Sequence, residues 1–524
     1  MPAARAREGA RLALRPVHVP ALPALAWCTR VTPGTEAVPV FHGSQVEIHA
    51  RGFVEGAWDG AFAAFDLARA TVLCGTGATT AADGVRFYAS TDQQGVLFSI
   101  RQRDSLVVSN SPSFALAVAG EALEPLYPFY VYDLLAIFRQ GLYCPDGRLR
   151  LRSGNALRVH YTTVMAVSPR GEVRFEAHAA CAPPGDYRSY AALLYGGVDA
   201  VLANARDEAR RSPYAPLVTL SRGYDSTAGA VLARRAGARE AFTYVDSRQA
   251  DPTRDSGVDN ARVLGMTCAE HDRWAYLTLA GAVEAEFGYG PLSSNVPLAA
   301  VEPQLAGRIL VTGESGDPMW DPCRTRVFDR MGRPWIRYPQ GLSVIEHRLR
   351  VGYVIFAPAC LAARHNRAIH AIAVSPEMRP WSIGVGYDRP LPRRLCEEAG
   401  LARDAFGTRK FASSHSHLND ARRFSARSLD LYRTFVQQAH AAIPGHERQR
   451  WRARAHLRHR AWDLLRPRQR YVRSTPLQRR LPFVLNAPPI RIPWDFMFTF
   501  QWTAASVQDR YRVTPHGTIS STEE

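Results

Sequence analysis

The chain has 524 residues, of which 46% are hydrophobic and 22% charged, and its formal net charge is +17. This length and apolar content exclude a disordered or fibrous protein and allow two or three packed domains. No apolar run approaches the roughly 20 residues that a membrane-spanning helix requires, so we expect no membrane partner.

Cysteine usage and the first residues indicate the compartment. The eight cysteines are dispersed, with no CxxC pair and no His/Cys cluster at metal-ligand spacing. Pro16, Pro20 and Pro23 interrupt the apolar stretch near the N-terminus, which argues against a cleaved signal sequence. Both observations favour free thiols in a reducing environment, and we therefore expect a cytoplasmic protein.

Residues 35–185 show short runs of alternating apolar and polar residues, separated by Gly, Asp and Ser. This pattern predicts an antiparallel, β-rich N-terminal domain, preceded by an extension at residues 1–34. The expected strands include residues 61–65, 71–74, 85–88, 95–100, 105–108, 156–160 and 173–175.

From residue 186 the pattern changes to strands that alternate with helices. This β-α-β order predicts a parallel sheet covered by helices, in a domain at residues 186–425 of an α/β protein. Residues 340–510 look mainly helical, and residues 426–524 are interpreted as an arginine-rich helical C-terminal region. The expected elements are helix 187–211, strand 216–220, helix 227–236, strand 241–245, a helix near 256–264 and strand 308–312.

The most informative segment reads Val-Thr-Leu-Ser-Arg-Gly-Tyr-Asp-Ser at residues 218–226, where a strand runs into a turn that opens a helix. Backbone N–H groups, the Ser221 and Ser226 hydroxyls and the helix N-terminus can together cradle a polyphosphate, and Asp225 can hold Mg²⁺ against it. The turn is neither a Walker A loop nor a GxGxxG loop. Taken alone, it could be an ordinary strand-to-helix turn.

A second loop, Thr-Gly-Glu-Ser-Gly-Asp at residues 312–317, follows the strand expected at 308–312. Loops at the carboxyl ends of neighbouring parallel strands converge on one crevice, so Glu314 and Asp317 should face the first loop. Without a phosphate site in the first loop, these two carboxylates would be ordinary solvated loop charges.

Lys410 is the only lysine among the 65 Lys and Arg residues. Where only a positive charge is needed, a chain with a bias toward arginine can replace lysine by arginine. Beside a phosphate, however, the larger, forked guanidinium cannot take the place of a compact ammonium. The pattern therefore indicates a functional lysine, with chance survival as the alternative.

These motifs resemble those of the asparagine-synthetase-like ATP pyrophosphatases. Residues 221–226 are similar to the SGGxDS pyrophosphate loop of that family, and residues 313–317 are similar to its GExxDE loop. Residues 58–66 and 107–111 resemble its N-terminal amidotransferase-type (Ntn) domain, and residues 387–407 resemble its C-terminal helical part. The resemblance implies an amidotransferase-like domain followed by an ATP-pyrophosphatase domain.

In that family ATP activates a carboxylate as an acyl-AMP, and an amine then attacks it to form an amide. Carried over to this chain, Glu314 and Lys410 would be catalytic, Glu314 as the base for the amine and Lys410 against the phosphate. Asp225 and Asp317 would bind Mg²⁺. The resemblance assigns the binding of ATP to Thr219, Ser221, Gly223, Asp225, Ser226, Tyr244, Thr312 and Gly313.

The sequence departs from the family pattern at several positions. It begins Met1-Pro2 and first shows a cysteine at Cys28, so we expect no glutaminase activity, as in relatives that form lactam rings with an amine of the substrate itself. Arg222 and Tyr224 predict a crowded phosphate cradle. Pro318, in place of the last acidic residue of GExxDE, predicts a weaker metal site.

The C-terminal region is strongly basic: residues 448–480 hold twelve arginines and a single acidic residue, Asp463. One interpretation is an anionic partner, such as an acidic peptide or a carrier protein, with a nucleic acid less expected. The alternative is a solvated helix face in an arginine-biased chain. The pair His415 and His417 is interpreted as part of a polar loop.

The sequence therefore predicts an ATP- and Mg²⁺-dependent, AMP-forming amide ligase that joins a carboxylate substrate to an amine substrate, as expected in bacterial specialised metabolism. A lactam-forming or lasso-peptide-type cyclase is one alternative. A degenerate protein that binds a nucleotide or a polyanion without catalysis is the other.

Overall fold

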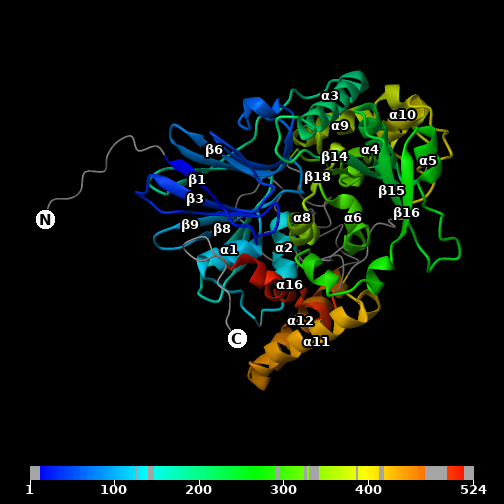
Figure 1. Ribbon diagram of the computed structural model, residues 1–524. Coiled ribbons are helices and arrows are strands. Elements are labelled where there is room, and N and C mark those ends of the chain that lie inside the picture. The colour runs from blue at the N-terminus through cyan, green and yellow to red at the C-terminus, as the bar shows by residue number, and fades with distance from the viewer. Residues whose placement is uncertain are drawn as a thin grey trace.

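The computed structural model describes residues 12–125, 127–139, 147–290, 295–323, 327–329, 341–384, 387–411, 418–465 and 492–512. Figure 1 shows two β-rich regions side by side, the first in blue and cyan and the second in green and yellow. The expected α/β class is confirmed at this level, because an antiparallel region precedes a parallel sheet covered by helices.

The N-terminal region contains a seven-stranded sheet in the order β1-β3-β2-β9-β8-β11-β10. The pair β1 and β3 is parallel, and the other pairs are antiparallel. The strands are β1 (Ala13–His18), β2 (Trp27–Val31), β3 (Ala37–His42), β8 (Leu97–Arg101), β9 (Leu106–Ser109), β10 (Gly147–Arg150) and β11 (Ala156–His160).

A six-stranded antiparallel sheet in the order β13-β12-β7-β6-β5-β4 packs against it. Apolar side chains of both sheets, such as Trp27, Phe53 and Phe87, share one buried cluster. Helix α1 (Pro112–Ala119) packs on strands β2, β8 and β9, and α2 (Tyr130–Arg139) packs on β10. The strands are β4 (Glu47–His49), β5 (Gly52–Trp58), β6 (Leu73–Ala81), β7 (Gly84–Tyr88), β12 (Val164–Val167) and β13 (Val173–Glu176).

The predicted boundary at residue 35 does not separate an extension from this sheet, because β1 and β2 precede it. Strand β2 is internal to the sheet, between β3 and β9. Strand β1 lies at the edge and exposes most of its side chains, so its sequence lacks the apolar alternation that marks a half-buried strand.

The second region is a five-stranded parallel sheet in the order β16-β15-β14-β17-β18. Strands β15 and β16, which follow β14 in the chain, lie on one side of it, and β17 and β18 lie on the other side. The topological switch point is therefore between β14 and β17. The strands are β14 (Ala215–Thr219), β15 (Glu240–Val245), β16 (Thr267–Asp272), β17 (Arg308–Val311) and β18 (Val354–Phe356).

Two of these strands were not predicted, and both have weak sequence signals. Strand β16 is a polar edge strand, and β18 is only three residues long, within a segment expected to be mainly helical. The helices of this region are α3 (Tyr187–Ala205), α4 (Tyr224–Arg235), α5 (Val258–Val263), α6 (Glu302–Leu305), α7 (Gly316–Trp320), α8 (Ile345–Val351), α9 (Asn366–Ala373) and α10 (Pro390–Glu398).

The C-terminal part contains α11 (Ala426–Ala441), α12 (Gly445–Leu465) and α16 (Thr499–Val507). Helices α11 and α12 extend from the body of the protein, whereas α16 returns to lie beside α1 (Figure 1). After α16, the Tyr511 ring stacks on Phe114 with 5.0 Å between ring centroids. No helix in the described segments combines the length and apolar character that crossing a membrane would require.

Candidate active site

The first candidate loop joins β14 to α4. Ser221 Oγ accepts a hydrogen bond from the Gly223 backbone N–H at 3.0 Å and lies 2.8 Å from Ser226 Oγ. The Thr227 hydroxyl donates to the carbonyl oxygens of Ser221 and Gly223, at 3.0 and 2.7 Å. These bonds fold the turn tightly onto the first turn of α4, whose leading N–H groups lack intrahelical acceptors and favour an anion.

The second loop packs directly on the first, and two glycines make this approach sterically feasible. A Cβ atom on Gly313 would lie 2.4 Å from the Ser226 backbone nitrogen, and one on Gly316 would lie 2.3 Å from Cγ of Asp225. The neighbouring strands β14 and β17 hold the loops together, with Val218 paired to Val311. The predicted convergence of the two loops is therefore present in the structure.

Asp225 and Asp317 form an acidic pair with opposite pKa shifts. Burial, and then the negative charge of Asp317, raise the pKa of Asp225 to about 7. Burial would also raise the pKa of Asp317, but the positive charges of Lys410 and Arg389 outweigh it and hold that pKa below the usual value. Among the described residues, Asp225 Oδ1 is buried without a hydrogen-bond partner.

This pair fits the way in which proteins hold Mg²⁺ beside phosphate. The ion usually takes one or two carboxylates, keeps several waters and completes its shell with phosphate oxygens. A buried carboxylate oxygen without a donor, Asp225 Oδ1, is a suitable ligand. The described segments contain no group of three or more His, Cys, Asp or Glu side chains arranged to hold a metal by themselves.

Two cations face Asp317. The Lys410 ammonium forms an ion pair with Asp317 Oδ2, and the Lys410 side chain remains half exposed. The Arg389 guanidinium bridges two carboxylates, with Nη2 at 3.4 Å from Asp317 Oδ1 and Nη1 at 3.1 Å from Asp321 Oδ1. Arg389 is buried and was not predicted, because nothing in its local sequence distinguishes it among the many arginines.

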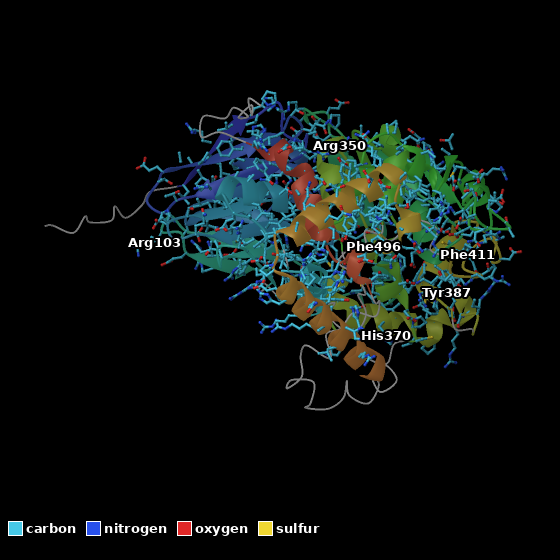
Figure 2. All side chains as sticks on the ribbon, turned by 90° about the horizontal axis from the view of Figure 1, so that it is seen from below. Arg103, Arg350, His370, Tyr387, Phe411 and Phe496 are labelled. Carbon is cyan, nitrogen blue, oxygen red and sulfur yellow. The ribbon has the colours of Figure 1, made fainter. Side chains whose placement is uncertain are left out.

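The predicted crowding of the cradle by Arg222 and Tyr224 is wrong, because both side chains pack on the segment that carries Arg389 and Lys410. The Tyr224 hydroxyl accepts from Arg393 Nε at 3.2 Å, and its ring lies 5.1 Å from that of Tyr387. Arg222 Nε donates at 3.2 Å to the carbonyl oxygen of residue 405. Tyr387 and Phe411, which lie on this segment, are labelled in Figure 2.

A glycine completes this docking. The Gly407 N–H donates to the Arg222 carbonyl oxygen at 2.7 Å, and a Cβ on Gly407 would lie 2.3 Å from the Tyr224 ring. Gly407 also has φ of +67°, a backbone conformation that favours glycine. The unusual residues of the first loop therefore hold the Lys410 segment in place.

Glu314 is half-buried, and its removal from water raises its pKa to about 7. Its carboxylate accepts from the amide Nε2 of Gln94, which belongs to the antiparallel region, and from Asn295 Nδ2 at 3.2 Å. Gln94 and Asn295 were not predicted, because they are distant in sequence from the second loop and carry no motif.

The four other positions assigned to ATP, besides Ser221, Gly223, Asp225 and Ser226 of the first loop, fall into two groups. Thr219, Thr312 and Gly313 lie at the carboxyl edge of β14 and β17, where the Thr312 N–H donates to the Phe356 carbonyl oxygen at 2.9 Å. The Tyr244 side chain instead packs in a buried cluster with Leu217, separate from the cluster that contains residues of α4. The structure therefore does not bring the Tyr244 side chain to the first loop.

The basic C-terminal region lies partly outside the described residues. Helix α12 covers its beginning, and residues 466–480 are outside, as are His415 and His417. The seven cysteines in the described segments are free thiols. Among the residues of α12 whose side chains are described, the exposed arginines are Arg448, Arg450, Arg452, Arg454 and Arg460.

A scan against models of known protein families finds no match to this chain, and a search of curated proteins finds no matching relative.

Proposed function

We propose that the protein is an ATP-dependent, AMP-forming amide ligase, which activates a substrate carboxylate as an acyl-AMP and transfers the acyl group to an amine. The observation that carries this proposal is the convergence of Asp225, Asp317 and Lys410 at the switch point between β14 and β17. These residues come from three separate segments of the chain, and Gly316 lies against Asp225 where the two loops meet.

In the activation step, the loop between β14 and α4 would bind the polyphosphate of ATP. The N–H groups of the first turn of α4 and the Ser221 and Ser226 hydroxyls supply donors to the phosphate oxygens. Mg²⁺ held by Asp225 and Asp317 would neutralise phosphate charge. Arg389 and Lys410 place two more positive charges beside Asp317, where negative charge accumulates as pyrophosphate leaves.

In the transfer step, the amine nitrogen attacks the acyl carbon of the acyl-AMP. Glu314 is the candidate general base, since a carboxyl with a pKa of about 7 can exchange a proton near neutral pH. The incoming nitrogen loses its proton to Glu314, and AMP departs with the electron pair of the broken C–O bond.

The basic surface of α12 favours a substrate that is part of an acidic peptide or is attached to a carrier protein. The Arg452 and Arg454 guanidiniums lie over the rings of Trp494 and Trp451, at 5.6 and 5.2 Å from the ring centroids. These stacks present the cationic face of α12 to solvent. A lactam-forming reaction, in which one peptide carries both the carboxylate and the amine, is compatible with such a partner. The second candidate function is the binding of a polyanion without catalysis.

The decisive experiment is carboxylate-dependent exchange between pyrophosphate and ATP, measured with Mg²⁺ and a panel of carboxylic acids. Asp225→Asn and Asp317→Asn should each abolish the exchange while circular dichroism shows a retained fold. Asp259→Asn is the matched control, because Asp259 also lies in the first turn of a helix, α5, and is exposed. Exchange in both active-site variants at the wild-type rate would refute the proposal.

A further inference from the structure

A short turn of the antiparallel region reaches the parallel-sheet region at Glu314. Asp92 Oδ1 accepts from the Gln94 backbone N–H at 2.9 Å and from the Ser90 hydroxyl at 2.6 Å, and the Gly95 N–H donates to Ser90 Oγ at 2.9 Å. The Ser90, Asp92 and Gln94 side chains are buried. The turn therefore presents the side chains that follow Asp92 in a fixed direction.

Two glutamines extend from this turn to the second loop. The Gln94 amide donates from Nε2 to Glu314 Oε2, and the Gln93 amide donates from Nε2 to Ser315 Oγ at 3.2 Å. Asn295 Nδ2 donates to the other carboxylate oxygen of Glu314 at 3.2 Å. One amide donor on each oxygen fixes the plane of the carboxylate.

The same two glutamines carry acceptors that have no donor. Gln93 Oε1 and Gln94 Oε1 are buried and receive no hydrogen bond from the described residues. A buried carbonyl oxygen without a donor is costly, and a ligand that brings N–H groups relieves that cost. The Gln94 amide nitrogen is hydrogen-bonded to Glu314, so Gln94 Oε1 of the same amide lies beside the carboxylate; the Gln93 amide nitrogen is hydrogen-bonded to Ser315, so Gln93 Oε1 lies beside the next residue of the second loop.

We propose that Gln94 is a positioning residue for Glu314, and that Gln93 Oε1 and Gln94 Oε1 form the subsite for the amine substrate. This inference rests on the proposed function. A primary amine suits the subsite, because its two N–H groups can donate to the amide oxygens as it binds, and one of them gives its proton to Glu314 as the N–C bond forms. As the N–C bond to the acyl group forms, the C–O bond to AMP breaks, its electron pair leaves with AMP and the amine proton moves to Glu314. The antiparallel region thereby contributes to the ligase reaction without glutamine hydrolysis.

The charge state of Glu314 depends on the groups around it. Burial raises its pKa, the hydrogen bonds from Gln94 and Asn295 lower it, and the negative charge of Asp92 raises it. The Cys360 thiol and the Tyr353 hydroxyl also interact with Glu314, and burial raises the pKa of both. Loss of the Gln94 donor should therefore shift the titration of Glu314 to higher pH.

The test separates the two half-reactions in the full-length protein. Hydroxylamine serves as the amine probe, hydroxamate formation reports the transfer step, and pyrophosphate exchange reports activation. Two variants are tested, Gln94→Leu and the milder Gln94→Asn. Both should leave pyrophosphate exchange within about twofold of the wild type. Both should reduce hydroxamate formation at least about tenfold, which is the scale expected when a positioning group is lost. The pH at which hydroxamate formation reaches half its maximum should rise by about one unit.

Gln102→Leu removes a glutamine of the same region whose Nε2 donates to the Ala119 carbonyl oxygen at 2.8 Å, and it should change neither half-reaction. Hydroxamate formation and its pH profile unchanged in both Gln94 variants would overturn this inference alone. An equal loss of exchange and transfer would also overturn it, because it would indicate a structural role. Absence of exchange in the wild-type protein would overturn the proposed function together with this inference.

Discussion

Gly316 of the second loop lies directly against the carboxylate of Asp225 in the first, so closely that a Cβ on Gly316 would stand 2.3 Å from Cγ of Asp225. Gly316→Ala should therefore displace the Asp225 carboxylate and reduce pyrophosphate exchange, by about 10²-fold if the displacement reaches the order of an ångström. The exchange rate at saturating Mg²⁺ measures this effect.

Gly196 offers the matched control for this substitution. It lies within α3, and a Cβ there would meet no atom within 4 Å. Gly196→Ala should leave exchange unchanged and increase the free energy of unfolding by about 0.5–1 kcal/mol, because alanine loses less conformational freedom in a helix. Equal exchange rates in the two variants would show that contact with Gly316 does not constrain Asp225.

The Tyr224 hydroxyl stabilises the docking of the Lys410 segment through Arg393, whose guanidinium is almost fully buried. Tyr224→Phe removes this acceptor and should lower the free energy of unfolding by about 2 kcal/mol, since a hydrogen bond to a charged group is lost. Urea titration followed by fluorescence measures the change. A change below about 0.5 kcal/mol would show that Glu397, 3.2 Å from Arg393, satisfies the guanidinium by itself.

The sequence was sufficient for those parts of the fold and site that depend on local pattern. The predicted β14, α3 and α4 around the first loop are present within a few residues of their expected bounds, although α3 ends before residue 211. The pairing of the two loops followed from the rule that parallel strands end at a common edge. Asp225, Asp317 and Lys410 are accordingly found together.

The missed parts depend on contacts between distant segments. Arg389 is 72 residues from Asp317, and Gln94 is 220 residues from Glu314. An isolated arginine or glutamine has no periodicity or spacing by which to recognise it. The direction of the Tyr224 side chain likewise depends on Gly407, a partner that only the folded chain brings near. Short or polar edge strands such as β18 and β16 lack a sufficient pattern for the same reason.

Cys28 should not serve as a glutaminase nucleophile. It lies in the internal strand β2, where it pairs with Phe41 of β3 and Ser109 of β9, and burial raises the pKa of its thiol. A thiol in this state is a poor nucleophile. Incubation of the protein with glutamine should therefore release no glutamate above background, and Cys28→Ala should match the wild type. Glutamate release that disappears in Cys28→Ala would contradict this prediction.

Glu346 should make stability depend on pH. Its carboxylate accepts from the Ser111 hydroxyl at 2.7 Å and the Tyr511 hydroxyl at 2.5 Å, and burial raises its pKa from 4.5 to about 7. The folded state therefore holds this proton more tightly than the unfolded state, and the associated stability is lost as the pH rises from about 4.5 to 7.

Glu346→Gln preserves the shape of this group and removes its ionisation. Relative to the wild type, the variant should gain about 2 kcal/mol in free energy of unfolding between pH 5 and pH 7.5, given roughly 1.4 kcal/mol per pKa unit. Denaturant titrations of both proteins at the two pH values measure this difference. A difference that is independent of pH would show that Glu346 has the same charge in the folded and unfolded states.

Lys410 provides the sharpest test of the catalytic assignment, because its ammonium pairs with Asp317 and its half-exposed side chain allows substitution without loss of the fold. If a compact ammonium must reach both this carboxylate and a phosphate, Lys410→Arg should be nearly as damaging as Lys410→Ala, and each should reduce amide formation by about 10²–10³-fold. Arg409→Lys, at the exposed neighbouring residue, makes the reverse exchange and should have no effect. Wild-type rates in Lys410→Arg would show that the only lysine of the chain has no special role and was retained by chance. Pyrophosphate exchange that persists without amide formation would instead limit the role of Lys410 to the transfer step.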